Sequence, residues 1–312
     1  MTKELPKIRR NPFIYPTSDD IDLLISQAFP GEHVANFIPM KEGYSNSNFK
    51  INLSSGQSYT LRIHTNGQEK YLTQINVLNQ LKAGLAVPDM IFSSDQLIFQ
   101  NYPVSIHSYI EGFTLTNALP LMTGNADKLY LTGLSAATTL KKINSLKIDT
   151  ISFGADDYFA FIDDCLDKIS RQNKSEISQC QRIRSFIKEH HELIEQCYQA
   201  YGLVHGDFNP ENIVIDPKSC QVSGILDWEW CHLGSVYADP GNLLRPHNHL
   251  PESFVAGFLD SYLEDHFDCK DLFFKKIRLI DLSSHLEKLT SYDEKSQQYL
   301  DSAQIIRSII GA

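Results

Sequence analysis

Three polar residues with a regular spacing carry the clearest chemistry in this sequence. Asp207 and Asn212 lie in the segment HGDFNPEN at residues 205–212, and Asp227 follows Asn212 by fifteen positions. Mg²⁺-dependent phosphoryl transfer requires an aspartate that orients a hydroxyl, together with an asparagine and a second aspartate near the metal. The sequence therefore predicts a phosphotransferase that uses ATP and Mg²⁺.

Short apolar strands on both sides should position these residues. Residues 203–204 lead into the segment, residues 213–215 leave it as a strand, and residues 216–219 have turn chemistry. Residues 222–226 form a second strand that ends at Asp227, so Asn212 and Asp227 should lie side by side. Two oxygen ligands suit Mg²⁺, which keeps waters and shares the nucleotide's phosphates. Asp207 is left for the substrate hydroxyl.

HGDFNPEN and the later Leu-Asp-Trp-Glu at 226–229 resemble the catalytic segment of the aminoglycoside phosphotransferase and choline kinase superfamily. The resemblance implies that Asp207 is catalytic and that Asn212 and Asp227 bind Mg²⁺. It implies an α+β, bilobal, protein-kinase-like fold, with a small N-terminal lobe of antiparallel sheet plus helix and a larger, mostly helical C-terminal lobe. It also implies that Asp239 braces the catalytic loop, and His205 is assigned to structural support as well.

Residues 40–49, MKEGYSNSNF, resemble the nucleotide loop of the choline, ethanolamine and thiamine kinase branch. Gly43 permits a tight turn, and the short side chains of Ser45, Asn46 and Ser47 leave backbone N–H groups free to face phosphate oxygens. The alternative interpretation of this loop is an ordinary β-hairpin turn.

The strand at residues 59–64 alternates, which places Arg62 on the face that should look into the nucleotide cleft. An arginine here matches the choline kinase branch, and its guanidinium can hold phosphate oxygens bidentately. The alternative is a solvated strand arginine. The family places a glutamate on the following helix to pair with this cation, whereas here Gln74 has the best register and Glu69 lies over a turn earlier. Either Gln74 or Glu69 could therefore be the partner of Arg62.

Residues 104–112, VSIHSYIEG, resemble the strand and hinge that join the lobes of a kinase. The resemblance implies that the carbonyl of Ser108 and the N–H of Ile110 bind the adenine edge. An ordinary buried strand that ends in a glycine turn is the alternative.

The chain should divide near Glu111-Gly112 into an N-terminal nucleotide-binding lobe, residues 1–111, and a C-terminal catalytic and substrate-binding lobe, residues 112–312. Residues 1–17 form an irregular basic arm, followed by a helix capped by residues 18–20. A helix over 68–82 should present Leu72, Ile75, Leu78 and Leu81 on one face. Further helices are predicted at 125–145, 158–170, 176–200, 252–266 and from 271 to the C-terminus, and a short helix should begin with Asp239 as its N-cap.

Glu229, Trp230 and Tyr237 follow the metal aspartate and are the predicted acceptor-binding residues. Carboxylates with aromatic faces suit an amine, so the acceptor is expected to be a cationic hydroxyl compound, either aminoglycoside-like or related to choline, ethanolamine or thiamine. A neutral acceptor such as homoserine or a sugar, and a nucleotide-binding regulatory module without catalysis, stay open as alternatives. A protein kinase is disfavoured because Asp-Trp-Glu at 227–229 replaces Asp-Phe-Gly.

The composition indicates which classes of partner and which cellular environment to expect. With 28 basic and 38 acidic residues the net charge is −10, which argues against a nucleic-acid partner. No apolar stretch is long enough to span a membrane, and the N-terminus lacks the apolar core of a secretory signal. Six scattered cysteines without a metal-ligand rhythm indicate reduced thiols, as in a cytoplasmic protein.

Overall fold

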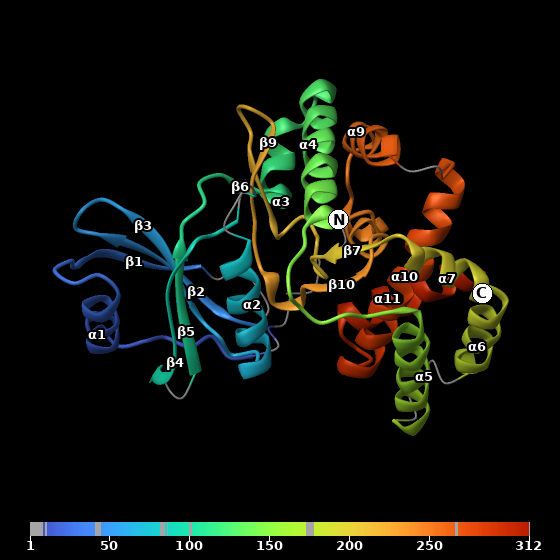
Figure 1. The fold of residues 1–312 in the computed structure, drawn as a ribbon, viewed down its shortest axis with the longest axis horizontal. Coiled ribbons are helices and arrows are strands. Elements are labelled where there is room, and N and C mark those ends of the chain that lie inside the picture. Colours follow the sequence, from blue (N-terminus) through green and yellow to red (C-terminus); the bar gives the residue numbers. More distant parts are fainter. Residues whose placement is uncertain are drawn as a thin grey trace.

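The computed structural model of the chain describes residues 9, 11–40, 45–81, 85, 87–99, 102–172, 178–265 and 268–311. Within them the chain forms two lobes, a β-rich one and a mostly helical one (Figure 1). This is the predicted α+β, protein-kinase-like fold.

A five-stranded antiparallel sheet is the framework of the N-terminal lobe. Its strand order is β1-β2-β3-β5-β4, and its strands are β1 (Val34–Met40), β2 (Ser47–Leu53), β3 (Ser58–Ile63), β4 (Met90–Phe99) and β5 (Tyr102–Ser108). Residues 54–57 form a short turn between β2 and β3, as expected for antiparallel neighbours. β3 lies between β2 and β5, so Arg62 pairs with Asn48 on one side and with Ser105 on the other.

The two faces of this sheet differ in chemistry. Helix α1 (Ser18–Ala28) packs its buried Ile21, Leu24 and Ile25 into an apolar cluster with inward-facing residues of β2, β3 and β5. The opposite face is polar although it is buried: His64 contacts the Ser105 hydroxyl at 2.7 Å, and so does His107. Because side chains alternate along a strand, this is the face that carries Arg62. The sheet therefore has an apolar core on one side and a polar layer on the other.

Helix α2 (Gln68–Gln80) lies between the sheet and the C-terminal lobe (Figure 1). The predicted apolar face of this helix was right only at its C-terminal end. Leu78 and Leu81 are buried, but Leu72 is 53% exposed, and the helix buries Tyr71, Gln74 and Val77 instead. The polar layer beneath α2 explains the difference, since Gln74 and Tyr71 can meet polar groups there. The helix also ends at Gln80, two residues before the predicted end.

The N-cap of helix α1 lies one residue earlier than predicted. Thr17, and not Ser18, is the N-cap: its hydroxyl accepts from the N–H of Asp20, and the Asp20 carboxylate accepts from the N–H of Thr17. This reciprocal pair is a capping box.

The C-terminal lobe combines helices with two small sheets. β6 (Phe113–Thr114), β8 (Ile213–Asp216) and β9 (Gln221–Ile225) form one sheet, and β7 (Tyr201–Val204) pairs with β10 (His232–Ser235). The helices are α3 (Leu115–Ala118), α4 (Ala126–Ser145), α5 (Ala155–Arg171), α6 (Cys180–Glu189), α7 (His191–Gln199), α8 (Ala238–Leu243), α9 (Glu252–Tyr262), α10 (Lys270–Ser291) and α11 (Gln297–Ile310). Short 3₁₀ turns include η1 (Leu119–Met122), η3 (Trp228–Trp230), η4 (Pro246–Asn248) and η5 (Leu263–Asp265).

Two of the predicted helices are each divided. The segment predicted as one helix over 176–200 is α6 and α7, which meet at His190, and the segment from 271 onward is α10 and α11, separated by residues 292–296. In both cases the chain reverses or bends so that two apolar faces pack into the same core. The change from the five-stranded sheet to the C-terminal sheets falls between Ser108 and Phe113, and the predicted lobe boundary at residue 111 remains a prediction.

The basic arm was predicted over residues 1–17, of which residues 1–8 and 10 lie outside the described part. Residues 11–16 have no regular structure, yet they lie against the sheet. The N–H of Ile14 donates to the Ser47 hydroxyl at 2.8 Å, and the Asn11 amide donates to the carbonyl of Thr65 at 2.9 Å. Among the described residues no helix is both long and apolar enough to cross a membrane.

The two buried histidines of the polar layer should make the stability of the N-terminal lobe depend on pH. Burial, reinforced by the charge of Arg62, lowers the pKa of His107 from 6.5 to about 3, and burial also lowers the pKa of His64. A lowered histidine pKa means that the native state binds fewer protons than the unfolded state, so stability is complete above pH 6.5 and falls as the pH decreases.

We predict that the unfolding free energy of the wild type decreases by about 2 kcal/mol through His107 alone when the pH is lowered from 6.5 to 5. Urea denaturation of the wild type and of His107→Gln at both pH values measures this, and the variant should lose less stability on acidification. Equal losses in the two proteins would contradict a neutral, buried His107.

Candidate functional site

The loop between β7 and β8 holds the predicted catalytic residue. Its backbone is fixed by Asp239, a buried residue of α8 whose two carboxylate oxygens accept from the N–H groups of His205 (2.8 Å) and Gly206 (2.9 Å). Gly206 has φ +81°, and a side chain there would approach the carbonyl oxygen of Trp230 to 2.4 Å. Asp239 lies inside α8, whose N-cap is Tyr237, so the predicted N-cap role of Asp239 was wrong. The carboxylate instead caps the loop.

His205 connects this loop to the end of β9. Its Nδ1 accepts from the N–H of Asp207 at 3.2 Å, and its Nε2 lies 2.9 Å from the carbonyl oxygen of Leu226. Since Nδ1 is the acceptor, Nε2 carries the proton and donates. The ring is fully buried, so His205 joins the two segments that carry Asp207 and Asp227.

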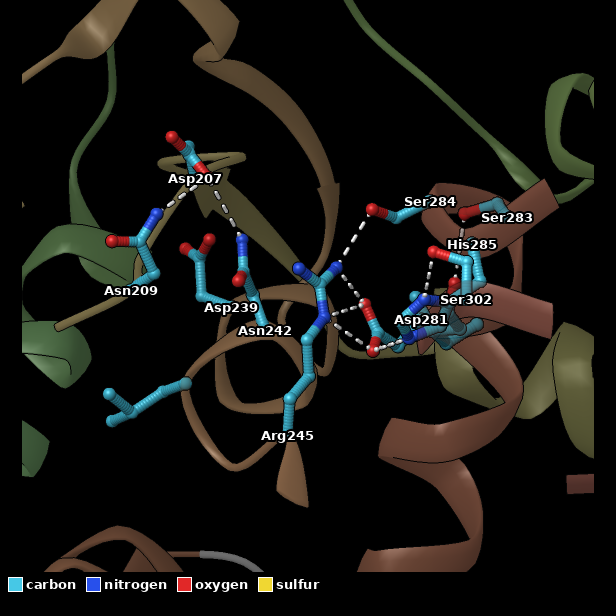
Figure 2. A network of polar contacts seen from close by, with 12 residues as sticks. Asp207, Asn209, Asp239, Asn242, Arg245, Asp281, Ser283, Ser284, His285 and Ser302 are labelled. Carbon is cyan, nitrogen blue, oxygen red and sulfur yellow. Dashed lines mark hydrogen bonds and ion pairs between the residues drawn. The ribbon is translucent and has the colours of Figure 1, made fainter. Parts of the chain in front are cut away.

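Three neutral amides hold the carboxylate of Asp207. Asn209 and Asn242 donate to Oδ1 at 2.8 and 3.3 Å (Figure 2), and Asn212 donates to Oδ2 at 2.9 Å. A carboxylate oxygen accepts about two hydrogen bonds. Oδ1 is therefore satisfied, whereas Oδ2 can still accept one from a substrate hydroxyl.

Asn212 and Asp227 lie side by side at the open ends of β8 and β9, as the strand-turn-strand pattern predicts. β8 and β9 are antiparallel partners, and the N–H of Leu226 donates to the carbonyl of Asn212 at 2.9 Å. Asn212 uses its amide N–H₂ group on Asp207, which leaves its side-chain oxygen for a cation. Together with a carboxylate oxygen of Asp227 this is an oxygen donor set of the kind that fits Mg²⁺.

Arg62 bridges the two lobes. Its Nη1 donates to Gln74 at 2.8 Å and to the carboxylate of Asp227 at 2.7 Å, and its Nε donates to Asn48 at 3.0 Å. The helix partner of Arg62 is thus Gln74, and the described contacts include none between Arg62 and Glu69. Burial acts to lower the pKa of this guanidinium, but attraction to Asp227 and then Glu229 raises it.

Glu229, predicted to bind the acceptor, is engaged in contacts within the protein. It is 4% exposed, and its carboxylate accepts from the amide of Asn46 at 2.8 Å and from the amide of Asn66 at 2.7 Å, both in the N-terminal lobe. Burial, followed by repulsion from Asp227, raises the pKa of Glu229 to about 7. This residue joins the lobes.

The two predicted aromatic residues are also engaged within the protein. The ammonium of Lys70, from α2, lies 3.5 Å from the centre of the Trp230 ring, so a cation of the chain itself already covers this face. Tyr237 is buried, and its hydroxyl donates to Asp268 at 2.6 Å and accepts from Lys276 at 3.2 Å. The described contacts therefore do not support either ring as a binding face for the acceptor.

The predicted nucleotide loop is only partly described, since Gly43 lies outside the described residues. The guanidinium of Arg9 donates to the carbonyls of Ser45 (2.8 Å) and Asn46 (2.9 Å), and the hydroxyl of Ser47 accepts from the arm. The side chains of Asn46 and Ser47 are buried and bonded within the lobe. They shape the loop, and the arm packs behind it.

The predicted hinge follows β5 directly. The N–H of Ser108 donates to the carbonyl of Asp89 at 2.9 Å. The side chain of Ile110 lies over Gly224 of β9, where any side chain would come within 2.3 Å of it. Ile110 is therefore held against the hairpin that leads to Asp227.

This combination of loop, hairpin and bridging arginine agrees with a sequence profile of the "Phosphotransferase enzyme family", which matches residues 36–272. The chain belongs to this family. Its activity class is accordingly that of a kinase-type phosphotransferase.

Solved aminoglycoside phosphotransferases share the fold at low sequence identity. ADP-bound APH(2'')-Ib is 16% identical with a TM-score of 0.67, covering 95% of this chain and 98% of that chain. A thermostable mutant of APH(4)-Ia in ternary complex with ADP and hygromycin B is 16% identical with a TM-score of 0.69, covering 93% and 97%.

Local sequence similarity extends to much longer proteins. Acyl-CoA dehydrogenase family member 11 of Rattus norvegicus is 49% identical over 41 residues, which are 13% of this chain and 5% of that protein. Acyl-CoA dehydrogenase family member 10 of Mus musculus is 39% identical over 64 residues, 20% of this chain and 6% of that protein.

Sequence reasoning missed several residues of the site: Arg9, Asn66, Asn209 and Asn242. Asn209 lies inside HGDFNPEN, so its short polar side chain next to Asp207 was a usable signal. The other three act through contacts with residues distant in the sequence, for which the local pattern holds no signal.

We predict that Glu229→Ala destabilises the protein by about 2–4 kcal/mol, because the amides of the buried Asn46 and the partly buried Asn66 both lose their acceptor. Glu264→Ala is the matched control: its side chain is 75% exposed, lies 3.8 Å from Lys141, and should cost less than about 1 kcal/mol. Urea denaturation measures both. If Glu229 bound the acceptor instead, Glu229→Ala would keep its stability and raise only the KM for the acceptor.

Proposed function

We propose that this phosphotransferase moves the γ-phosphoryl group of ATP, with Mg²⁺, to a hydroxyl group of a small molecule. The observation that carries the proposal is the convergence of Asp207, Asn212, Asp227 and Arg62 from both lobes on one site. The nucleotide-bound neighbours, among them a streptomycin–ATP complex of APH(2")-IIa, support ATP as the donor.

On the donor side, Arg62 supplies the phosphate-binding charge. Its guanidinium is rigid and stays charged near neutral pH, so it can hold phosphate oxygens bidentately. Backbone groups of Ser108 and Ile110 would hold the adenine edge, and the loop at Gly43, Ser45, Asn46 and Ser47 would cover the phosphates. The Arg9 contacts would help to fix the backbone of Ser45 and Asn46 in that role.

Asn212 and Asp227 would hold the metal through their side-chain oxygens. Bound there, Mg²⁺ would neutralise charge on the phosphates and orient them. The protein's own contribution is orientation: Asn212 is fixed by its bond to Asp207, and Asp227 by its ion pair with Arg62.

Asp207 acts on the acceptor. Its Oδ2 accepts the hydroxyl hydrogen, which orients the oxygen for in-line attack. The acceptor oxygen forms a bond to the γ-phosphorus, the bond from that phosphorus to the β–γ bridging oxygen breaks, and ADP leaves with the electron pair. The hydroxyl proton passes to Asp207.

A nucleotide-binding module without catalysis is the second candidate, and the glutamine at position 74 is the feature that favours it. The ion pair with Asp227 weakens this argument, because it gives Arg62 a carboxylate partner without a glutamate on α2. Retention of Asp207, Asn212 and Asp227 also favours an active enzyme.

We predict that Asp207→Ala lowers kcat by roughly 10²–10⁴-fold while MgATP affinity stays nearly unchanged, since this carboxylate acts on the acceptor. Asp227→Ala should instead weaken MgATP binding. Coupled ADP-release kinetics and equilibrium titration with MgATP separate the two. Equal losses of nucleotide affinity in both variants would contradict these roles.

For Arg62 we predict that Lys substitutes partly and Ala poorly. Lys keeps the charge, but both variants lose the planar fork, whose Nη1 donates to Gln74 and Asp227 while Nε donates to Asn48. The KM for MgATP in the two variants is the measurement. An Ala variant with wild-type KM and kcat would show that Arg62 only joins the lobes.

A further inference from the structure

A second polar network connects the proposed catalytic residue to helix α10. Asn242 donates to Asp207, and Arg245 lies three residues further along the chain, beside the carboxylate of Asp281 (Figure 2). Arg245 is 8% exposed, and none of these contacts involves the N-terminal lobe. The network therefore lies on the side of Asp207 where the acceptor, and not the nucleotide, would bind.

Only part of the Arg245 guanidinium is used within the protein. Nε donates to both oxygens of Asp281 at 3.2 and 2.9 Å, and Nη2 donates to Asp281 at 2.6 Å and to Ser284 at 2.7 Å. The described contacts give Nη1 no partner, and Figure 2 shows this nitrogen on the side of Asn242 and Asp207. Asp281 thus fixes the guanidinium with one N–H₂ group turned toward the site.

Lys288 adds a second cation to the same place. Asp281, Ser284, His285 and Lys288 are spaced i, i+3, i+4 and i+7 along α10, so they share the helix face that meets Arg245. Lys288 is half-buried, and within the described chain its ammonium has no hydrogen bond or ion pair.

The charges of both Arg245 and Asp207 act on the ammonium of Lys288. Burial and then the charge of Arg245 lower the pKa of Lys288 to about 8, while Asp281, Asp207 and Glu287 act in the opposite direction without contacting the ammonium. A partly buried ammonium without a counterion is costly. It is the arrangement expected where an anionic ligand completes the site.

His247 borders these two cations on the exposed turn η4. Although the residue is exposed overall, its ring is partly shielded from solvent. This shielding, followed by the charges of Arg245 and Lys288, lowers the pKa of His247 to about 4, so its ring is neutral at pH 7 and can donate one N–H. Of the nearby carboxylates, Asp281 is bound to Arg245, and Asp301 acts on His247 from α11.

We infer that the acceptor is an anionic hydroxyl compound, whose carboxylate or phosphate group binds Lys288, Arg245 Nη1 and His247 while its hydroxyl meets Asp207. The inference rests on the proposed function, because it assigns the acceptor of the same reaction. It replaces the cationic acceptor expected from Glu229, Trp230 and Tyr237. Those side chains already have partners within the protein.

The test uses the full chain with MgATP and a coupled ADP-release assay. Four classes of acceptor are compared: hydroxy acids of several chain lengths, sugar phosphates, neutral alcohols and sugars, and amino alcohols with aminoglycosides. We expect turnover with an anionic class, and the hydroxy-acid and sugar-phosphate arms distinguish a carboxylate from a phosphate.

Lys288→Gln should raise the KM for that acceptor by roughly 10–100-fold, because a charged hydrogen bond is lost, and should leave the KM for MgATP unchanged. Lys288→Arg should retain most of the affinity. Lys275→Gln, which removes an exposed lysine from the same helix, is the matched control and should behave as the wild type.

A second readout does not require turnover. Amine-reactive labelling of Lys288, followed by peptide mass spectrometry, should slow when inorganic phosphate or acetate is added, whereas labelling of Lys275 should not change. If neither phosphate nor acetate slowed the labelling of Lys288, the inference would be overturned.

The remaining outcomes separate the two proposals. Turnover confined to neutral or cationic acceptors, or anionic turnover that Lys288→Gln leaves intact, would overturn the anion site but keep the kinase. A protein that neither binds MgATP nor releases ADP with any acceptor or with water would overturn the proposed function itself.

Discussion

The buried charge of Arg62 is the constraint on which the arrangement of the two lobes depends. A guanidinium in the interior of a sheet loses its hydration and needs anionic partners. Helix α2 offers only the neutral Gln74, so the balancing carboxylates come from the other lobe, as Asp227 in direct contact and Glu229 nearby. The segment at 227–230 consequently packs under α2, where Glu229 also binds Asn46 and Asn66.

The same pair suits the proposed reaction. Asp227 and Arg62 neutralise each other as the protein stands, and bound MgATP offers each of them a new partner of opposite charge. Arg62 would exchange a carboxylate for phosphate oxygens, and Asp227 would exchange a guanidinium for a metal ion. Neither charge is left buried and alone at any stage, which avoids the penalty of several kcal/mol that an unpaired buried ion carries.

The sequence predicted the features that depend on local pattern. The β8–β9 hairpin that joins Asn212 to Asp227 and the inward face of β3 follow from motif spacing and strand alternation. The fold follows from the family resemblance of the segment at 205–212. It misassigned the buried face of α2, because the face beneath that helix is polar, and a periodicity rule assumes an apolar core. It also could not show that Glu229, Trp230 and Tyr237 already have partners, since Asn66, Lys70 and Asp268 lie far from them in the sequence.

The described groups that contact Asp207 are neutral, whereas the nearby cation Arg245 does not contact it. A cation in direct contact would favour the ionised carboxylate and oppose its taking a proton. Asp207 is instead held by three neutral amides, from Asn209, Asn212 and Asn242, which fix its direction without adding positive charge. Among the described contacts Arg245 does not touch Asp207, and much of its charge is balanced by Asp281. Positive charge could then act on the proposed anionic acceptor at a distance, while the carboxylate that would receive the hydroxyl proton has only neutral donors.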